Sequence, residues 1–84
     1  MDESILFYLK KSGKAYVDHL VKEQGNWYAE VTNGVMKINT YSLYGGKMTY
    51  NRLSSLLKRD FDISLPDERT LRLQRTSGNR LYYA

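Results

Sequence analysis

The chain has 84 residues, of which 42% are hydrophobic and 13% aromatic, and its formal net charge is +4. This length predicts a single domain, residues 1–84, with one small hydrophobic core, and the hydrophobic content argues against intrinsic disorder. The absence of cysteine excludes disulfides, thiolate metal sites and a cysteine nucleophile.

The first third of the chain predicts two helices. Asp2 is placed to cap the first helix, residues 5–9 supply its apolar face, and Gly13 follows its end. Hydrophobic residues at helical spacing predict a second helix over residues 15–24, with Gly25 just beyond it. Helix, short glycine turn and helix is the succession with which winged-helix and helix-turn-helix domains commonly start.

The run at residues 5–9 is also the longest uninterrupted apolar stretch of the chain. It is far shorter than the roughly 20 residues of a membrane-spanning helix. The acidic pair Asp2 and Glu3 replaces the basic region with which a signal peptide opens. We therefore expect a cytoplasmic protein with no membrane partner.

A β-hairpin is predicted over residues 27–43. Asn33 and Gly34 form a pair typical of type I′ turns, and a two-residue turn there places Glu30 opposite Lys37. The same register gathers the apolar side chains on one face of the hairpin. These are Trp27, Ala29, Val31, Met36 and Ile38.

A helix is the alternative over these residues, because Trp27, Val31 and Val35 also recur at helical spacing. Gly34 in the middle of a helix would cost about 1 kcal/mol relative to alanine. Charge pairing, alternation and turn chemistry agree on the hairpin, which we therefore prefer.

A third helix is predicted with Thr49 as its N-cap and its end near residue 60 or 61. Arg52 and Arg59 are seven residues apart and share one helical face, which Lys58 adjoins. The apolar stripe of this helix consists of Leu53, Leu56, Leu57 and Phe61.

A second hairpin is predicted over residues 69–83. Leu71 and Leu73 alternate with polar residues and would face the core. The composition of residues 76–79 is typical of a turn. A helix that begins at residues 66–68 is the alternative, and the strict alternation along the following segment favours the strand.

With four turn residues, Arg75 lies opposite Arg80 in this hairpin. Like charges in that position weakly destabilise a hairpin, which suggests that the two arginines have an anionic partner. Together the elements predict an α+β fold in which about three helices pack on a small antiparallel sheet. The sheet is built from the two β-hairpins, 27–43 and 69–83, in a winged-helix-like arrangement.

The positive charge is concentrated in the second half of the chain. Residues 47–84 contain eight Lys or Arg against four Asp or Glu, whereas residues 1–46 contain five of each class. Such a surface indicates a polyanion or an acidic protein as partner. We expect a non-enzymatic, regulatory nucleic-acid-binding domain, with DNA favoured over RNA, whose basic hairpin and flanking helix contact phosphates. The predicted contact residues are Arg52, Lys58, Arg59, Arg69, Arg72, Gln74, Arg75 and Arg80.

The eight tyrosines of the chain allow two interpretations. Aromatic side chains among basic residues can stack on the bases of single-stranded nucleic acid. Tyrosine is also common on half-buried strands and in protein interfaces, and this second interpretation is preferred because no RRM-type aromatic motif is present.

Two other functions are alternatives. The first is a protein-binding module or inhibitor that docks on an acidic partner protein through the same arginines. The second is a small ribonuclease in which His19, the single histidine, acts as acid or base. No catalytic partner for His19 is evident, and the sequence contains no metal-binding or cofactor motif. Exposed strand edges in so short a chain also allow a homodimer.

Overall fold

The computed structural model describes residues 7–9 and 13–84. Residues 7–9 are helical, and two short 3₁₀ helices, η1 (Thr40–Ser42) and η2 (Glu68–Thr70), lie in the connecting segments. No helix in these ranges is long and apolar enough to cross a membrane. The main elements are β1 (Tyr16–Glu23), β2 (Asn26–Thr32), β3 (Lys37–Asn39), α2 (Tyr50–Phe61), β4 (Leu73–Ser77) and β5 (Arg80–Tyr83).

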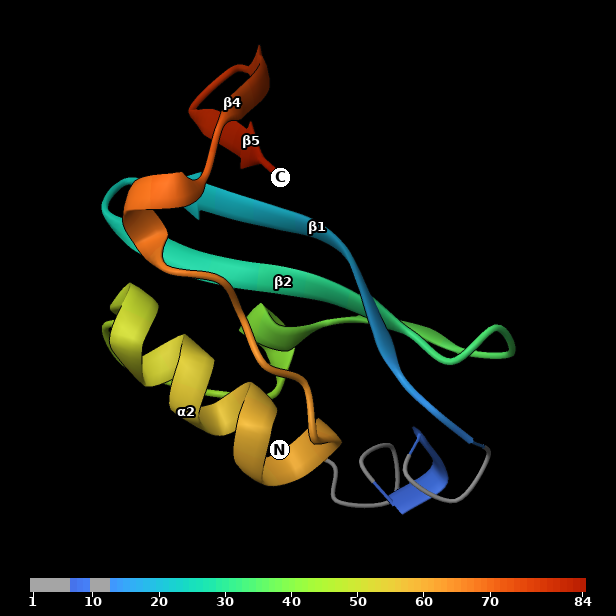
Figure 1. Ribbon diagram of the computed structural model, residues 1–84. Helices are drawn as coiled ribbons and strands as arrows, with labels where there is room; N and C mark the ends of the chain where they lie inside the picture. The colour runs from blue at the N-terminus through green and yellow to red at the C-terminus, as the bar shows by residue number, and fades with distance from the viewer. Residues whose placement is uncertain (1–6, 10–12) are drawn as a thin grey trace.

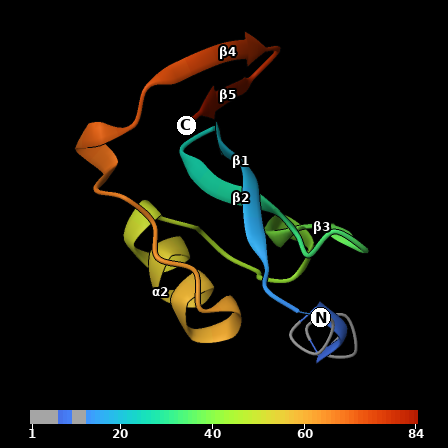
Figure 2. The same ribbon diagram turned by 45° about the vertical axis from the view of Figure 1, so that its right-hand side comes forward.

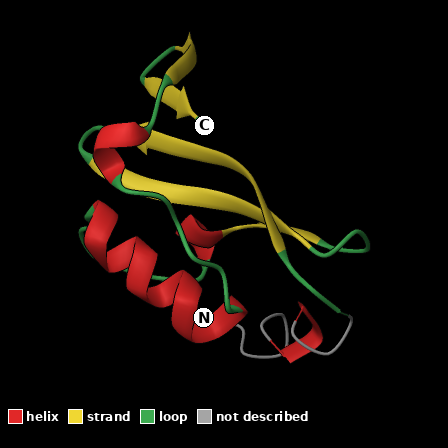
Figure 3. Cartoon of the chain, viewed as in Figure 1, coloured by secondary structure: helices red, strands yellow, loops and turns green. Residues whose placement is uncertain are grey.

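The five strands form one antiparallel sheet in the order β3-β2-β1-β5-β4 (Figure 1). β1 is the central strand, and β3 and β4 are the two edges. α2 lies against one side of the β1–β2 pair, and the β4–β5 hairpin lies at the far side of the molecule from α2 (Figures 1 and 2). Figure 3 shows the same arrangement of sheet and helix, with helices, strands and loops in different colours.

The main hydrophobic core fills the space between the sheet and α2. Leu53 and Leu57 of α2 are completely buried and pack with Trp27, Ala29 and Val31 of β2. Burial of each such leucine contributes about 1.5–3 kcal/mol relative to leaving it in water. The apolar stripe of α2, which follows the helical repeat, therefore packs against the apolar side chains that alternate along β2.

The prediction for α2 is confirmed. The Thr49 hydroxyl accepts the backbone N–H of Arg52 at 3.1 Å, which is the expected N-cap bond. The helix ends at Phe61, and Asp62 follows it in the left-handed conformation with φ 55°.

The prediction of about three helices on a small sheet is wrong, because residues 15–24 contain β1 in place of the second helix. Leu20 faces α2, whereas the adjacent Val21 is buried on the other side of the sheet. A central strand that buries both faces carries consecutive apolar residues, and their spacing alone does not distinguish it from a helical stripe. Gly25 does not end a helix, since Gln24 and Gly25 form the two-residue turn between β1 and β2 with φ of 50° and 82°.

This correction also removes the winged-helix-like arrangement. The described ranges contain one long helix, α2, and the segment that would supply the second helix of a helix-turn-helix unit is the centre of the sheet. Of the predicted first helix, residues 7–9 are helical and the remainder lies outside the described residues.

The first predicted hairpin is present as β2 and β3, but its register is wrong. Lys37 lies opposite Thr32, and Glu30 lies opposite Asn39. The turn therefore spans four residues, 33–36. The Asn33 side chain closes it by accepting hydrogen bonds from the backbone N–H groups of Val35 and Met36, at 2.9 and 2.8 Å.

The register differs from the predicted one by two residues. An even shift keeps every side chain on its own face of the sheet, whereas a shift by one would reverse them all. The apolar face is consequently the predicted one, and Lys37 still forms an ion pair with Glu30 at 3.3 Å, now as a diagonal neighbour. The buried residues on this face are Trp27, Ala29, Val31 and Ile38.

The second predicted hairpin is present as β4 and β5, again with a different turn. Ser77 pairs with Arg80, so the turn has two residues and its Gly78 adopts φ 59°. Arg75 therefore lies opposite Tyr82. The predicted juxtaposition of Arg75 and Arg80 is wrong, and the repulsion inferred from it does not support an anionic partner.

The two leucines of this segment differ in burial. Leu71 packs against the main core, whereas Leu73 on the edge strand β4 is 53% exposed. The expectation that both face the core is therefore wrong for Leu73. The reason is that the hairpin extends the sheet away from the part that α2 covers.

Candidate functional site

The face of the sheet opposite α2, called the open face below, carries its own small cluster of buried residues. Val21, Tyr28 and Tyr82 form this cluster from three adjacent strands. The strand register places Val21 directly between the two tyrosines. α2 does not cover this face (Figure 2), and of the other described helices the short η1 reaches its border with Tyr41, so neighbouring side chains of the same face provide the burial of the cluster.

Arg75 covers one end of this cluster. Its guanidinium carbon lies 3.7 Å from the centre of the Tyr82 ring, as the direct pairing of the two residues requires. A guanidinium over an aromatic ring is held by about 0.5–1 kcal/mol at an exposed site. The contact fixes the position of Arg75 and leaves its N–H groups available to an anion, because the side chain makes no ion pair in the described part of the chain.

Arg80, Glu23 and Tyr28 form a hydrogen-bonded group next to the cluster. Arg80 Nε and the Tyr28 hydroxyl both donate to Glu23 Oε1, at 3.0 and 3.2 Å. Burial, together with the bond to the Glu23 carboxylate, raises the pKa of Tyr28 to about 12. Tyr28 therefore remains a protonated hydrogen-bond donor throughout the physiological pH range.

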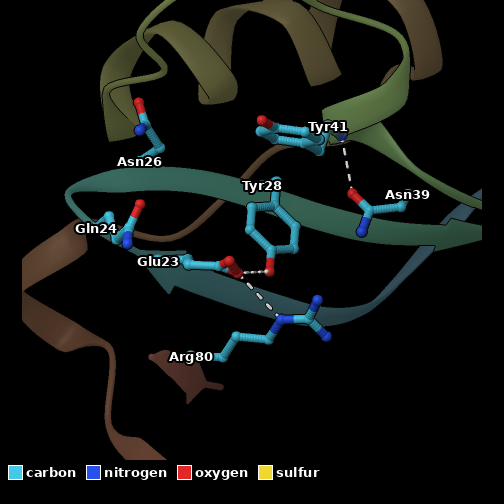
Figure 4. A pocket seen from close by; sticks show the side chains of 7 residues that line it. All are labelled: Glu23, Gln24, Asn26, Tyr28, Asn39, Tyr41 and Arg80. Atoms are coloured by element: carbon cyan, nitrogen blue, oxygen red, sulfur yellow. Dashed lines mark hydrogen bonds and ion pairs between the residues drawn. The ribbon is translucent and has the colours of Figure 1, made fainter. Parts of the chain in front are cut away.

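A hollow of about 200 Å³ lies beside this group (Figure 4). Tyr28 stands in its centre, with the Tyr41 ring on one side and Glu23 and Arg80 on the other. Tyr41 is 69% exposed, and its ring meets that of Tyr28 in an edge-on arrangement with 5.8 Å between the centroids. The lining residues are Glu23, Gln24, Asn26, Tyr28, Asn39, Tyr41 and Arg80.

The predicted contact residues on α2 are engaged in local bonds. Arg52 donates to the backbone carbonyls of the preceding loop, Lys58 binds Asp62 at 2.6 Å, and Arg59 makes two bonds of 2.8 Å to Asp60. These side chains belong to the layer opposite the open face. The structure therefore separates them from the hairpin arginines.

The remaining predicted contacts lie at the C-terminal hairpin or close before it. Arg69 binds Asp67 at 3.0 Å, and Gln74 donates to the backbone carbonyl of Arg72 at 3.2 Å. Arg72 pairs with Ala84 through its backbone, and its side chain is exposed without an acidic partner among the described residues. Among the predicted residues, the structure brings Arg75 and Arg80 together on the open face.

His19 lies on the open face as well. It is exposed, and its ring is nearly perpendicular to that of Tyr82, with 5.8 Å between the ring centroids. The described residues contain no group of three or more His, Asp or Glu side chains that could hold a metal ion.

Sequence reasoning did not assign a site role to Glu23 or Tyr28, and for the tyrosines in general, Tyr41 and Tyr82 included, it gave base stacking as the less favoured interpretation. The alternation of Tyr28 with buried residues of β2 already placed it on the face away from the core. Its neighbours on that face become visible only when residues 16–23 are recognised as the adjacent strand, because the register brings Tyr82 and Glu23 to it.

Comparison with known protein families, curated proteins and solved structures gives no match for this chain.

Proposed function

We propose that the protein is a non-enzymatic nucleic-acid-binding domain that holds a single strand on its open face. The observation that carries the proposal is the charge left uncompensated on the C-terminal hairpin. Arg72 and Arg75 have no acidic partner in the described ranges. Of the other cations predicted as contacts, Arg52 donates to backbone carbonyls of a loop, and the rest bind carboxylates. Arg72 and Arg75 can contribute their full charge to the binding of a polyanion, because no existing ion pair has to break on binding.

A single strand fits this surface better than a duplex. The described part of the fold offers no free recognition helix, since α2 buries its apolar stripe against the sheet and its basic side chains are engaged elsewhere. An open sheet face with arginines and an exposed tyrosine suits unstacked bases and their phosphates. Because the winged-helix arrangement is absent, the surface gives no reason to prefer DNA over RNA.

The test is a series of affinities for a fluorescent single-stranded oligonucleotide at increasing salt concentration. Wild-type affinity should fall linearly on a double logarithmic plot, with a slope of about 0.7 per phosphate contact. The double variant Arg72→Gln/Arg75→Gln should bind more weakly, and its slope should be smaller by about 0.7 for each phosphate that the two arginines neutralise.

The matched control removes the same charge elsewhere. Lys14 and Lys47 are exposed and form no ion pair in the described part, and both lie outside the hairpin. Lys14→Gln/Lys47→Gln should keep the wild-type slope. Equal reductions of affinity in the two double variants would show that only net charge matters, and undetectable wild-type binding at low salt would refute the proposed function.

A second candidate rests on the edge strand β4. All five of its residues are exposed, and no described strand pairs with its outer edge, which could accept an extended segment of an acidic protein partner. Such a partner would protect the backbone amides of β4 from hydrogen exchange, whereas a nucleic acid bound to the open face would leave this edge unpaired. A homodimer through the same edge would bring Arg72 and Arg75 of two copies close together, so the charge disfavours it.

A further inference from the structure

The hollow on the open face has the size of a site for one ring system. Its volume of about 200 Å³ is smaller than the roughly 300–1,000 Å³ of pockets that bury drug-sized ligands. It is formed by three parts of the chain that the sheet brings together, namely the β1–β2 turn, the β3–η1 region and the start of β5 (Figure 4). A whole dinucleotide cofactor would not fit it, whereas a single base would.

Two amide side chains of the hollow retain unused donors. Asn26 Oδ1 accepts the backbone N–H of Met48 at 2.9 Å, and Asn39 Oδ1 accepts that of Tyr41 at 2.8 Å. Because a backbone N–H only donates, these bonds identify the oxygen of each amide and leave its nitrogen as a donor. Neither nitrogen has a hydrogen-bond partner among the described residues.

One acceptor in the hollow is also unused. Both bonds to the Glu23 carboxylate, from Tyr28 and Arg80, end on Oε1. Oε2 accepts no bond from any residue in the described ranges. The hollow therefore combines several N–H donors with one charged acceptor, which is a pattern that can recognise the edge of a polar heterocycle.

The Tyr41 ring supplies an aromatic surface beside these polar groups. Tyr28 meets it edge-on, so most of the Tyr41 ring remains in contact with solvent at 69% exposure. Stacking of a base on an exposed aromatic ring is the usual way in which proteins hold unpaired nucleotides. Arg80, which lines the hollow, lies on the same face as Arg75.

We infer that the hollow binds one nucleobase, stacked on Tyr41 and recognised at its edge by Asn26 and Glu23, which the strand register places directly opposite each other. The Asn26 donor matches the exocyclic carbonyl oxygen of guanine or uracil, and the Glu23 carboxylate matches a ring N–H of the same base. Adenine offers neither group at that edge. This inference rests on the proposed function, because the base belongs to the strand whose phosphates contact Arg75.

The experiment compares three single-stranded oligomers of equal phosphate number, namely oligouridylate, oligoadenylate and an abasic strand. The wild type should bind oligouridylate about tenfold more tightly than the abasic strand, which corresponds to the stacking contribution of one base. Oligoadenylate should lie between the two. Tyr41→Ala should reduce the preference over the abasic strand to less than twofold and leave the salt slope unchanged.

Tyr16→Ala is the matched control. Tyr16 is similarly exposed, at 56%, and does not line the hollow, so its removal should keep the preference for bases. Tyr41→Phe should keep it too, because stacking needs only the ring. Salt-dependent binding with equal affinity for base-bearing and abasic strands would refute the inference and leave the proposed function intact.

If no oligomer binds, the proposed function fails, and free nucleosides then decide the inference. Titration with guanosine, uridine and adenosine should shift the NMR amide signals of Asn26, Asn39 and Tyr41, with adenosine the weakest. Shifts confined to these residues would support a base site that acts without a polymer. Absence of shifts with all three nucleosides would refute the site.

Discussion

Arg75 stacks on Tyr82 directly across the β4–β5 hairpin, with 3.7 Å between the guanidinium carbon and the ring centre. Tyr82 is buried in the cluster with Val21 and Tyr28, whereas Arg75 is exposed. The pair therefore joins a structural residue to one that is accessible to a partner. It anchors the cationic group of the hairpin to the central part of the sheet.

This division predicts different effects of the two side chains on stability. Tyr82→Ala should lower the free energy of unfolding by about 3 kcal/mol, because it removes a buried aromatic ring. Arg75→Ala should lower it by less than about 1 kcal/mol, since it removes only an exposed contact. Urea unfolding followed by circular dichroism measures both changes. A larger decrease for Arg75→Ala than for Tyr82→Ala would contradict the assigned roles.

The ionisation of Tyr28 should be detectable at alkaline pH. Burial and the Glu23 carboxylate raise its pKa to about 12 in the folded protein, from an ordinary value of about 10. The folded state therefore retains this proton more tightly than the unfolded state does. The resulting stabilisation is fully present below pH 10 and is lost as the pH rises towards 12.

Spectrophotometric titration of the tyrosines should accordingly lose one group near pH 12 in Tyr28→Phe, while Tyr44 and Tyr50, whose pKa values are also raised by burial, keep their own high-pH steps. Glu23→Gln should move this group towards lower pH, because it removes the negative charge beside the hydroxyl. Tyr16→Phe serves as the control, since Tyr16 lies elsewhere on the sheet and is exposed. An unchanged high-pH step in Tyr28→Phe would show that another tyrosine is responsible.

Asp60 makes a second testable contribution to stability. It is buried in α2, accepts the Tyr44 hydroxyl at 2.5 Å and binds Arg59. Asp60→Ala leaves the partly buried Tyr44 hydroxyl without this acceptor, and we expect stability to fall by about 1–3 kcal/mol. Asp62→Asn, which removes the charge of the exposed partner of Lys58 and keeps a side chain that tolerates the left-handed conformation, should cost less than about 1 kcal/mol in the same unfolding experiment. Similar effects of the two variants would contradict the importance of burial at Asp60.

The parts of the fold that the sequence predicts correctly depend on local signals. Thr49 caps α2, and its leucines recur at helical spacing, so the helix follows from neighbouring residues alone. The two hairpins are also local, but their registers depend on side-chain bonds within the turns, such as those of Asn33. β1 is different, because its two-sided burial depends on distant segments. Leu20 packs in the core with α2, and Val21 packs against Tyr82 of β5, which lies about 60 positions away in the chain.

The candidate site is less predictable than the fold, because strands that are distant in the sequence bring its residues together. The concentration of arginine near the C-terminus is visible in the sequence, and so is Asp60 directly after Arg59, whereas the carboxylate that neutralises Arg80 is recognised only from the fold. Glu23 lies 57 residues before Arg80 and reaches it because β1 and β5 are neighbours. Charge counts therefore indicate a partner class, and the sheet register indicates which side chains remain free for it.

The burial of Val21 gives a direct test of the open-face cluster. Val21 is 1% exposed although no described helix covers it, because Tyr28 and Tyr82 enclose it. Val21→Ala should therefore destabilise the protein by about 2 kcal/mol, as expected for a buried aliphatic side chain. Val35→Ala makes the same chemical change at a turn position that is 72% exposed, and it should alter stability by less than about 0.5 kcal/mol. If the two variants unfold at the same urea concentration, the open face is not a packed layer, and neither Tyr82 nor Tyr28 is held rigidly enough to position Arg75 and the hollow beside it.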